Sequence, residues 1–238
     1  MKSIFKQLLR SIGYDIHRYN PSSSVGYQLE QTLRNFKIDL VFDIGSNVGQ
    51  FAKNLREVGY NDRIVSFEPL IDAHHALSKV ARGSKGWDVH ERCAIGDVNG
   101  TIQINVSTNS VSSSVLPMLK EHSDAAPESV FTRSEEAPIY TLDSVSDRYM
   151  TSRNSTLIKI DTQGFEWQVL DGASETLKCA RGVMIELSLV PLYSRQRLWR
   201  DIIARLEKQG FVLWSLNPAF VDPRDGRTLQ VDGVFFRK

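Results

Sequence analysis

The fold is decided by the stretch IDLVFDIGSNVGQF at residues 38–51, together with IVSFEP at residues 64–69. The apolar run at 40–42 is short and continuous, which is typical of a strand buried on both faces of a parallel sheet. Gly45 permits a tight turn where a ligand can approach the backbone. Apolar residues at helical spacing follow over 48–58, and a second buried strand ends in Glu68. This arrangement predicts a pocket for an adenosine group, with Glu68 accepting both ribose hydroxyls.

The glycine spacing separates two classes of cofactor. Dinucleotide-binding turns carry G-x-G-x-x-G and hold a pyrophosphate at a helix N-terminus. Here Asp43, Gly45 and Gly49 form D-x-G-x-x-x-G, which favours a ligand without phosphates, with Asp43 facing a cationic amino acid moiety. S-adenosylmethionine has that shape. A nicotinamide oxidoreductase, the rival from another enzyme class, would need the spacing that is absent.

The length and composition predict a single intracellular domain. The chain has 238 residues, of which 41% are hydrophobic, enough for one substantial core. A formal net charge of +1 does not suggest a nucleic-acid binder. Cys93 and Cys179 form neither a zinc pattern nor a disulfide framework, which fits a reducing cytoplasm. No apolar run approaches the ~20 residues of a membrane span. We therefore expect a cytoplasmic location.

Residues 1–26 are expected to form a unit of their own, ahead of a single domain at 27–238. Residues 1–16 predict an amphipathic helix, followed by a serine-rich linker at 20–26. The apolar face of this helix carries Ile4, Phe5, Leu8, Leu9 and Ile12. Such a face packs on its own domain, on a sister subunit in a homo-oligomer, or on an anionic membrane surface. The last case would make the protein peripheral to the inner face of the membrane.

Strands and helices alternate along most of the domain. We expect a third strand at 87–94, a hairpin turn at Asn99–Gly100 and a strand at 101–107. Residues 107–138 lack clear periodicity and predict either a lid or acceptor-binding loop or a flexible excursion. His122 would enter the site if this segment closes. The remaining elements are expected at 138–142, 195–209, 211–216 and 231–236.

A second strand and turn, LIKIDTQGFE at 157–166, place polar residues where a strand ends. In open α/β sheets, ligands bind beyond the carboxyl ends of the strands. Asp161 would therefore face the same crevice as Asp43 and Glu68. A further strand at 182–187 carries Glu186 near its end.

Several of these motifs resemble the FkbM family of S-adenosylmethionine-dependent methyltransferases. The matching runs are FDIGSNVGQF at 42–51 with FEP at 67–69, and KIDTQGFE at 159–166 with VLDGA at 169–173. AIGD at 94–97, TLD at 141–143 and Glu186 give further support over about residues 36–190. One position departs from the pattern, because the family usually has a glutamate where Gln163 stands.

The resemblance implies an α/β fold of the class I, Rossmann-like type. This is a seven-stranded, mostly parallel sheet with an antiparallel last strand and helices on both faces. The implied activity is O-methylation of a hydroxyl on a small molecule, such as a sugar, glycolipid or polyketide-type product. The residues implied to bind the cofactor are Asp43, Gly45, Ser46, Asn47, Gly49, Glu68, Pro69, Leu70, Ala94, Ile95 and Asp97.

Methyl transfer to an alcohol needs alignment of the hydroxyl with the methyl group and removal of a proton. Asp161 is the favoured general base, Glu186 is the second choice, and Lys159 would orient either carboxylate. Asp161 could equally cap the following helix. Although carboxylates of this kind could hold magnesium, no compact ligand cluster is present in the sequence, and we expect no required metal.

Two alternatives remain at the level of sequence. Some N-methyltransferases use an Asn/Asp-Pro-Pro-Tyr/Phe turn after the fourth strand, and Asn217-Pro218-Ala219-Phe220 is superficially close. It comes too late in the chain, and Asn-Pro is a common turn opener. A non-catalytic scaffold that retains the cofactor pocket is the other alternative.

Overall fold

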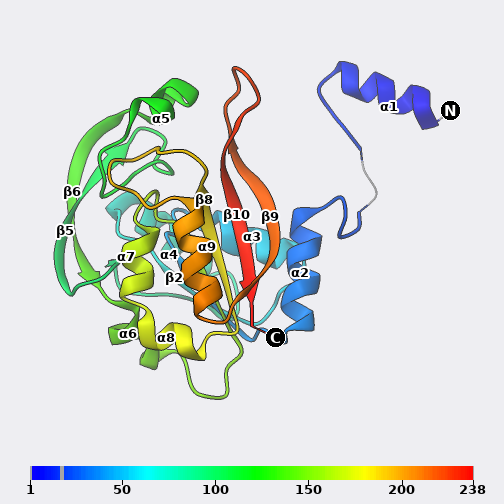
Figure 1. Ribbon diagram of the computed structural model, residues 1–238. Coiled ribbons are helices and arrows are strands. Elements are labelled where there is room, and N and C mark those ends of the chain that lie inside the picture. The colour runs from blue at the N-terminus through cyan, green and yellow to red at the C-terminus, as the bar shows by residue number, and fades with distance from the viewer. Residues whose placement is uncertain (1, 17–18, 238) are drawn as a thin grey trace.

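The protein is built around a seven-stranded sheet with the order β3-β2-β1-β7-β8-β10-β9 (Figure 1). The computed structural model describes residues 2–16 and 19–237, with side chains from residue 6 onward. The strands are β1 (Leu40–Ile44), β2 (Arg63–Phe67), β3 (Trp87–Val89), β7 (Thr156–Ile160), β8 (Gly182–Ser188), β9 (Val212–Val221) and β10 (Thr228–Phe236). β10 is antiparallel to both its neighbours, and the other pairs are parallel. The predicted sheet is confirmed.

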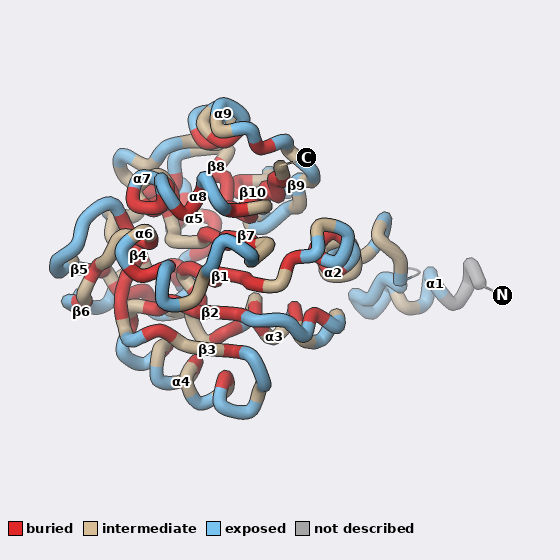
Figure 2. Tube along the Cα trace, turned by 90° about the horizontal axis from the view of Figure 1, so that it is seen from below, coloured by how far each residue is buried: buried red, intermediate tan, exposed pale blue. Residues whose placement is uncertain are grey.

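Helices cover both faces of this sheet, as predicted. One face packs against α2 (Val25–Asn35), α3 (Gln50–Glu57) and α4 (Ile71–Ala81). The other packs against α6 (Leu142–Val145), α7 (Glu166–Asp171), α8 (Ser174–Cys179) and α9 (Trp199–Lys208). Strand β1 shows why: Val41 belongs to the first core and Phe42 to the second, and both are fully buried. Apolar side chains on both faces of a strand require a cover on each side. Figure 2 shows the buried strands between the helical layers.

A second, three-stranded sheet lies beside the first. Its order is β4-β6-β5, with bounds Ala94–Ile95, Phe131–Tyr140 and Gly100–Ser107. Helix α5 (Lys120–Ala125) and a 3-10 turn η1 (Pro127–Ser129) lie between β5 and β6. A further 3-10 turn, η2 (Ser146–Arg148), follows α6. This small sheet contributes Ile104, Ala137 and Ile139 to a core that also contains Leu70 and Phe165. The sheet therefore supports the loops at the carboxyl ends of the main strands.

This second sheet corrects three predictions. The strand expected at 87–94 is interrupted, because β3 ends at Val89 and β4 joins the other sheet. Asn99–Gly100 does not form a hairpin, since β6 lies between β4 and β5. The segment at 107–138 is less irregular than expected, because Phe131–Tyr140 is a ten-residue strand. Its alternation is hidden in the sequence, because mostly polar residues are held there by pairing with β5.

Two C-terminal elements also differ from expectation. Helix α9 begins at Trp199, four residues later than predicted. Strand β9 extends to Val221, so Asn217–Phe220 lies within a strand and does not form a turn after it. A register shift between Gln230 and Val231 on the partner strand accommodates Pro218 at this sheet edge.

Helix α1 (Lys2–Ser11) stands apart from the domain in Figure 1. Its Leu8 is 63% exposed, and Ile12 just beyond it is 64% exposed. Among the described residues, no helix is both long and apolar enough to cross a membrane.

Candidate functional site

The site forms where the chain changes direction across the sheet, between β1 and β7. The loop after β1 passes so close to the loop after β7 that a Cβ atom on Gly45 would lie 1.8 Å from the carbonyl oxygen of Asp161. Gly45 also has a φ of +74°, a conformation that favours glycine. Only glycine allows these two loops to meet at the carboxyl ends of their strands, where ligands bind in such sheets.

The loop continues into α3 through two further left-handed residues. Asn47 has a φ of +47°, and Gly49 has a φ of +86° at the N-cap of the helix. A Cβ atom on Gly49 would lie 2.8 Å from the ring of Trp87. Ser46 donates its hydroxyl to the carbonyl of Asp43 at 2.6 Å, which closes the turn. The conformation of this loop is therefore set by its own residues.

Glu68 connects the loops that follow β1 and β2. Its Oε2 accepts a hydrogen bond from the backbone N–H of Asn47 at 2.8 Å, and its Oε1 accepts one from Leu70 at 2.8 Å. The residue is 4% exposed, and burial raises its pKa to about 7 in spite of these bonds. Each oxygen retains a lone pair toward the cavity that Glu68 lines.

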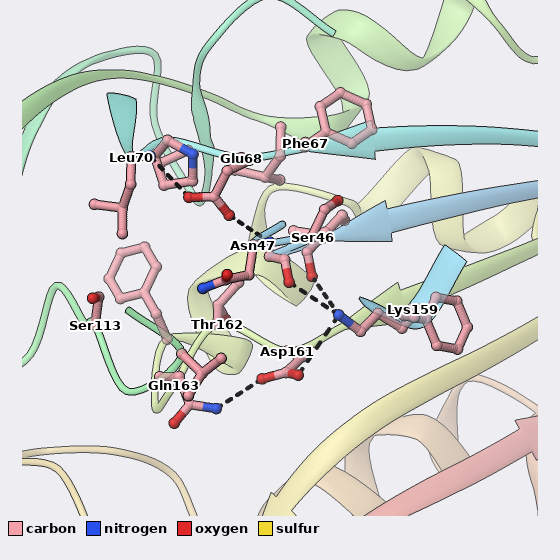
Figure 3. A pocket seen from close by; sticks show the side chains of 18 of the residues that line it. Ser46, Asn47, Phe67, Glu68, Leu70, Ser113, Lys159, Asp161, Thr162 and Gln163 are labelled. Atoms are coloured by element: carbon pink, nitrogen blue, oxygen red, sulfur yellow. Dashed lines mark hydrogen bonds and ion pairs between the residues drawn. The ribbon is translucent and has the colours of Figure 1, made fainter. Parts of the chain in front are cut away.

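A cavity of about 350 Å³ opens above these loops (Figure 3). The residues predicted for cofactor or catalysis that line it are Gly45, Ser46, Asn47, Glu68, Pro69, Leu70, Ala94, Ile95, Lys159 and Asp161. Asp43, Gly49 and Asp97 do not line it. The sequence reasoning did not single out Phe51, Ser113, Thr162 and Met184, which also line it. These four residues come from four different parts of the chain, which is why no local pattern reveals them.

The carboxylate of Asp43 faces Lys159 and is fully buried. The Nζ atom of Lys159 lies 3.1 Å from Oδ1 of Asp43 and 3.6 Å from Oδ2 of Asp161. Burial alone would lower the pKa of Lys159, but the two carboxylates outweigh burial and raise it. The ammonium group therefore stays charged beneath the cavity, in contact with both carboxylates.

Gln163, the position that departs from the family pattern, joins Asp161 to Glu186 by hydrogen bonds. The side-chain nitrogen of Gln163 donates to Oδ1 of Asp161 at 2.8 Å and to Oε2 of Glu186 at 2.9 Å. The hydroxyl of Tyr193 donates to Oε1 of Gln163 at 3.0 Å, which fixes the orientation of the amide. Figure 3 shows Asp161 between Lys159 and Gln163.

Glu186 is 8% exposed and also accepts a hydrogen bond from Gln230 at 2.6 Å. Burial, together with the carboxylates of Asp161, Glu166 and Asp232, raises the pKa of Glu186 well above its ordinary value. Glu186 is therefore protonated over a range where an exposed glutamate would be ionised, whereas Asp161, whose side chain is 37% exposed, is accessible.

A second cavity of about 560 Å³ adjoins the first. Asp161, Gln163, Asp232 and Val111 line both cavities. Glu186, Gln230 and His122 line only the second, and His122 reaches it from α5 without any large closure of the segment at 107–138. The histidines of α4 are placed elsewhere: the ring of His74 is bonded to the carbonyl of His90 at 2.8 Å. No group of three potential metal ligands within 2–16 and 19–237 is arranged to hold an ion.

The sheet order, the antiparallel β10 and a cavity at the switch point bounded by Glu68 define a class I methyltransferase. Within that class, the chain belongs to the FkbM methyltransferase family, because the methyltransferase FkbM domain matches residues 43–213. The protein is thus an S-adenosylmethionine-dependent methyltransferase, and the resemblance seen in the sequence is confirmed.

A solved structure with a TM-score above 0.5 supports the fold. A Klebsiella pneumoniae protein provisionally assigned as an O-methyltransferase aligns with a TM-score of 0.52 at 11% identity, over 99% of this chain and 89% of that chain. The magnesium protoporphyrin IX methyltransferase of Synechocystis PCC 6803, solved with S-adenosylmethionine, aligns with a TM-score of 0.46 at 11% identity, over 100% and 97%. No curated protein matches the sequence.

The first cavity fits S-adenosylmethionine in size and chemistry. Its volume lies in the range of roughly 300–1,000 Å³ that small-molecule pockets occupy. Leu70, Ile95 and Phe165 supply apolar walls for a purine, and the carboxylate of Glu68 lies where ribose hydroxyls can donate to it. The loop from Gly45 to Asn47 lines the same cavity and would border the remaining, methionine part.

Proposed function

We propose that this enzyme methylates a hydroxyl group of a sugar, glycolipid or polyketide-type acceptor, with Asp161 as the general base. The observation that carries the proposal is the position of Asp161, which lines both the cofactor cavity and the adjoining cavity. An acceptor in the second cavity and a methyl donor in the first would meet at this residue. Most other polar groups nearby are committed to bonds within the protein.

S-adenosylmethionine supplies a methyl group already activated by its sulfonium. The chain therefore has to align the acceptor oxygen and remove its proton as the new bond forms. Asp161 accepts that proton at its carboxylate. Gln163 holds one oxygen of the carboxylate at 2.8 Å, and Lys159 lies 3.6 Å from the other. These two contacts orient the carboxylate at the boundary between the cavities.

The test is methyl transfer from isotopically labelled S-adenosylmethionine to a panel of hydroxylated acceptors: simple glycosides, glycolipids and polyketide aglycones. We expect a product that carries one methyl ether, located by mass spectrometry and NMR. A methyl group found on nitrogen would reject the proposal and support the N-methyltransferase alternative. Tight binding of S-adenosylmethionine without transfer to any acceptor would instead support a scaffold.

A further inference from the structure

The second cavity has an acidic lining. Its lining includes the carboxyl groups of Glu128, Asp161, Glu186 and Asp232. Of the residues that the structure describes, no lysine or arginine lines it. The nearest cations are already paired: Lys159 with Asp43, and Arg224 with Asp222 at 2.6 Å.

Two of these carboxyl groups face each other directly. Asp232 on β10 lies opposite Glu186 on β8 in the antiparallel ladder. Like charges in such cross-strand positions are destabilising, and the pair is tolerated because the pKa of Glu186 is raised well above its ordinary value. No lysine or arginine in the described part of the chain forms an ion pair with either residue. The hydrogen bonds that Gln163 and Gln230 donate to the Glu186 carboxyl group both go to Oε2, so Oε1 remains available at the cavity. A purely structural role does not account for this unfavourable pair.

An independent observation in the same cavity also points to a ligand. His122 is 2% exposed and lines the cavity, and Nδ1 of its ring is buried without a hydrogen-bond partner among the described residues. Its ring lies between those of Tyr193 and Phe220, with centroids 5.2 and 5.3 Å away. Burial lowers its pKa, so the imidazole is neutral near neutral pH and can donate or accept. Buried polar groups normally have a partner, which here would come from the acceptor.

We infer that the acceptor unit entering this cavity is a hydroxylated amine in its protonated form, an amino sugar in chemical class, and that phosphorylated or carboxylated units are excluded. The inference deepens the proposed function and rests on it for the reaction. The ammonium group would lie at Asp232 and Glu186, where it would add to the partial counter-charge that Lys159 provides. The hydroxyls would reach His122 and Asp161, and the face of Phe220 suits the apolar face of a sugar ring.

The experiment measures binding, so that it does not depend on turnover. The full chain is saturated with S-adenosylhomocysteine, and three hexosamines (glucosamine, galactosamine, mannosamine) are titrated and compared with their parent hexoses and the hexose 6-phosphates. We expect at least one hexosamine to bind tenfold or more tightly than its hexose, and no 6-phosphate to bind. Equal binding of amine and parent, binding of a 6-phosphate, or no binding of any hexosamine would overturn the inference.

A matched pair of variants locates the charge. Asp232→Asn should reduce the preference for the hexosamine at least fivefold, whereas Asp225→Asn, on the exposed turn of the same hairpin, should leave it unchanged. The thermal midpoint of Asp232→Asn should be no lower than that of the wild type, because the opposition to Glu186 is relieved. A preference unaltered in Asp232→Asn would overturn the assignment of the ammonium position and with it the inference.

The outcome is separable from that of the proposed function. Selective hexosamine binding with the methyl group transferred to nitrogen would reject O-methylation and leave the charge selectivity intact. O-methylation of a phosphorylated acceptor would support O-methylation and reject the charge selectivity.

Discussion

The side-chain nitrogen of Gln163 lies 2.8 Å from Oδ1 of Asp161, at the boundary between the two cavities. The same nitrogen lies 2.9 Å from Oε2 of Glu186, so one amide group provides a proton to each of two carboxyl groups. Members of the family usually have glutamate here. A glutamate at this position would add a third carboxyl group, and in its ionised form it could not donate a hydrogen bond to Asp161. The amide of Gln163 does donate one.

Replacement of Gln163 should alter the pH dependence of methyl transfer. In Gln163→Glu, an added carboxylate beside Asp161 would disfavour ionisation of the base, so the acidic limb of the kcat profile should move to higher pH. Gln163→Leu, which removes both donated bonds, should lower kcat about tenfold with little change in the Kd for cofactor. A Gln163→Glu enzyme with an unshifted profile would contradict this positioning role.

Asp161→Asn should abolish most turnover while the cofactor still binds. General bases typically contribute roughly 10²–10⁴-fold in rate, so we expect a loss of about that size in kcat. Steady-state kinetics and calorimetry with S-adenosylmethionine measure the two effects separately. Asp62→Asn, at an exposed position in the turn before β2, is the matched control. Near-normal turnover in Asp161→Asn would leave Asp161 with a structural role only.

Glu68→Gln should weaken binding of S-adenosylmethionine about 10- to 100-fold, because hydrogen bonds to charged groups contribute about 1.5–3 kcal/mol. The variant also removes an acceptor from the backbone N–H of Asn47 or Leu70, which orders the cavity wall. Calorimetry provides the Kd, and Glu57→Gln on the exposed side of α3 is the control. An unchanged Kd would mean that Glu68 serves only to join the two loops.

The cofactor half of the site could be predicted because its residues are close together in sequence. The loop from Asp43 to Gly49 carries its own turn signals, and its flanking strands are short apolar runs that burial on both faces requires. The acceptor half of the site could not be predicted from the sequence. Gln163, Glu186 and Gln230 are joined by hydrogen bonds only because β7, β8 and β10 lie side by side, and no local pattern specifies that register.

Asp43 illustrates the same limit within a correctly predicted strand. Its position at the end of β1 was evident, but its partner was not. Lys159 lies opposite Asp43 in the parallel pairing of β1 with β7, so the carboxylate contacts Lys159 and does not line the cavity.

Stability should fall as the pH rises from 6.5 to 8. Burial raises the pKa of Glu68 and of Glu166 to about 7, against an ordinary value of 4.5. The folded state therefore holds protons that the unfolded chain has already released. Because the folded state binds more protons, its stability falls with rising pH until both carboxyl groups are ionised. His122 opposes the trend mainly below its ordinary pKa of 6.5, outside the window.

We expect the Tm to be a few degrees higher at pH 6.5 than at pH 8, measured by calorimetry without ligand. Glu166→Gln removes one of the two titrating groups and should reduce the slope. A Tm that increases with pH across this interval, or a slope unaffected by Glu166→Gln, would contradict the argument.

For the amphipathic N-terminus we propose contact with an anionic membrane surface. Helix α1 carries Lys2, Lys6 and Arg10 and no acidic residue, and Leu8 and Ile12 are exposed. Each basic residue near an anionic surface contributes about 1 kcal/mol, and buried apolar side chains add to this. The full chain should therefore co-sediment with phosphatidylserine-containing vesicles and much less with phosphatidylcholine vesicles.

The double variant Leu8→Gln/Ile12→Gln should lose this co-sedimentation while methyl transfer to a soluble acceptor is unchanged. Val98→Gln, which replaces an exposed apolar residue on the turn between β4 and β5, provides the control and should bind vesicles as the wild type does. Equal sedimentation with both lipids would show that the basic residues of α1 do not select an anionic surface. If the double variant instead changes the sedimentation coefficient of the free protein, the apolar face of α1 contacts a second copy of the chain.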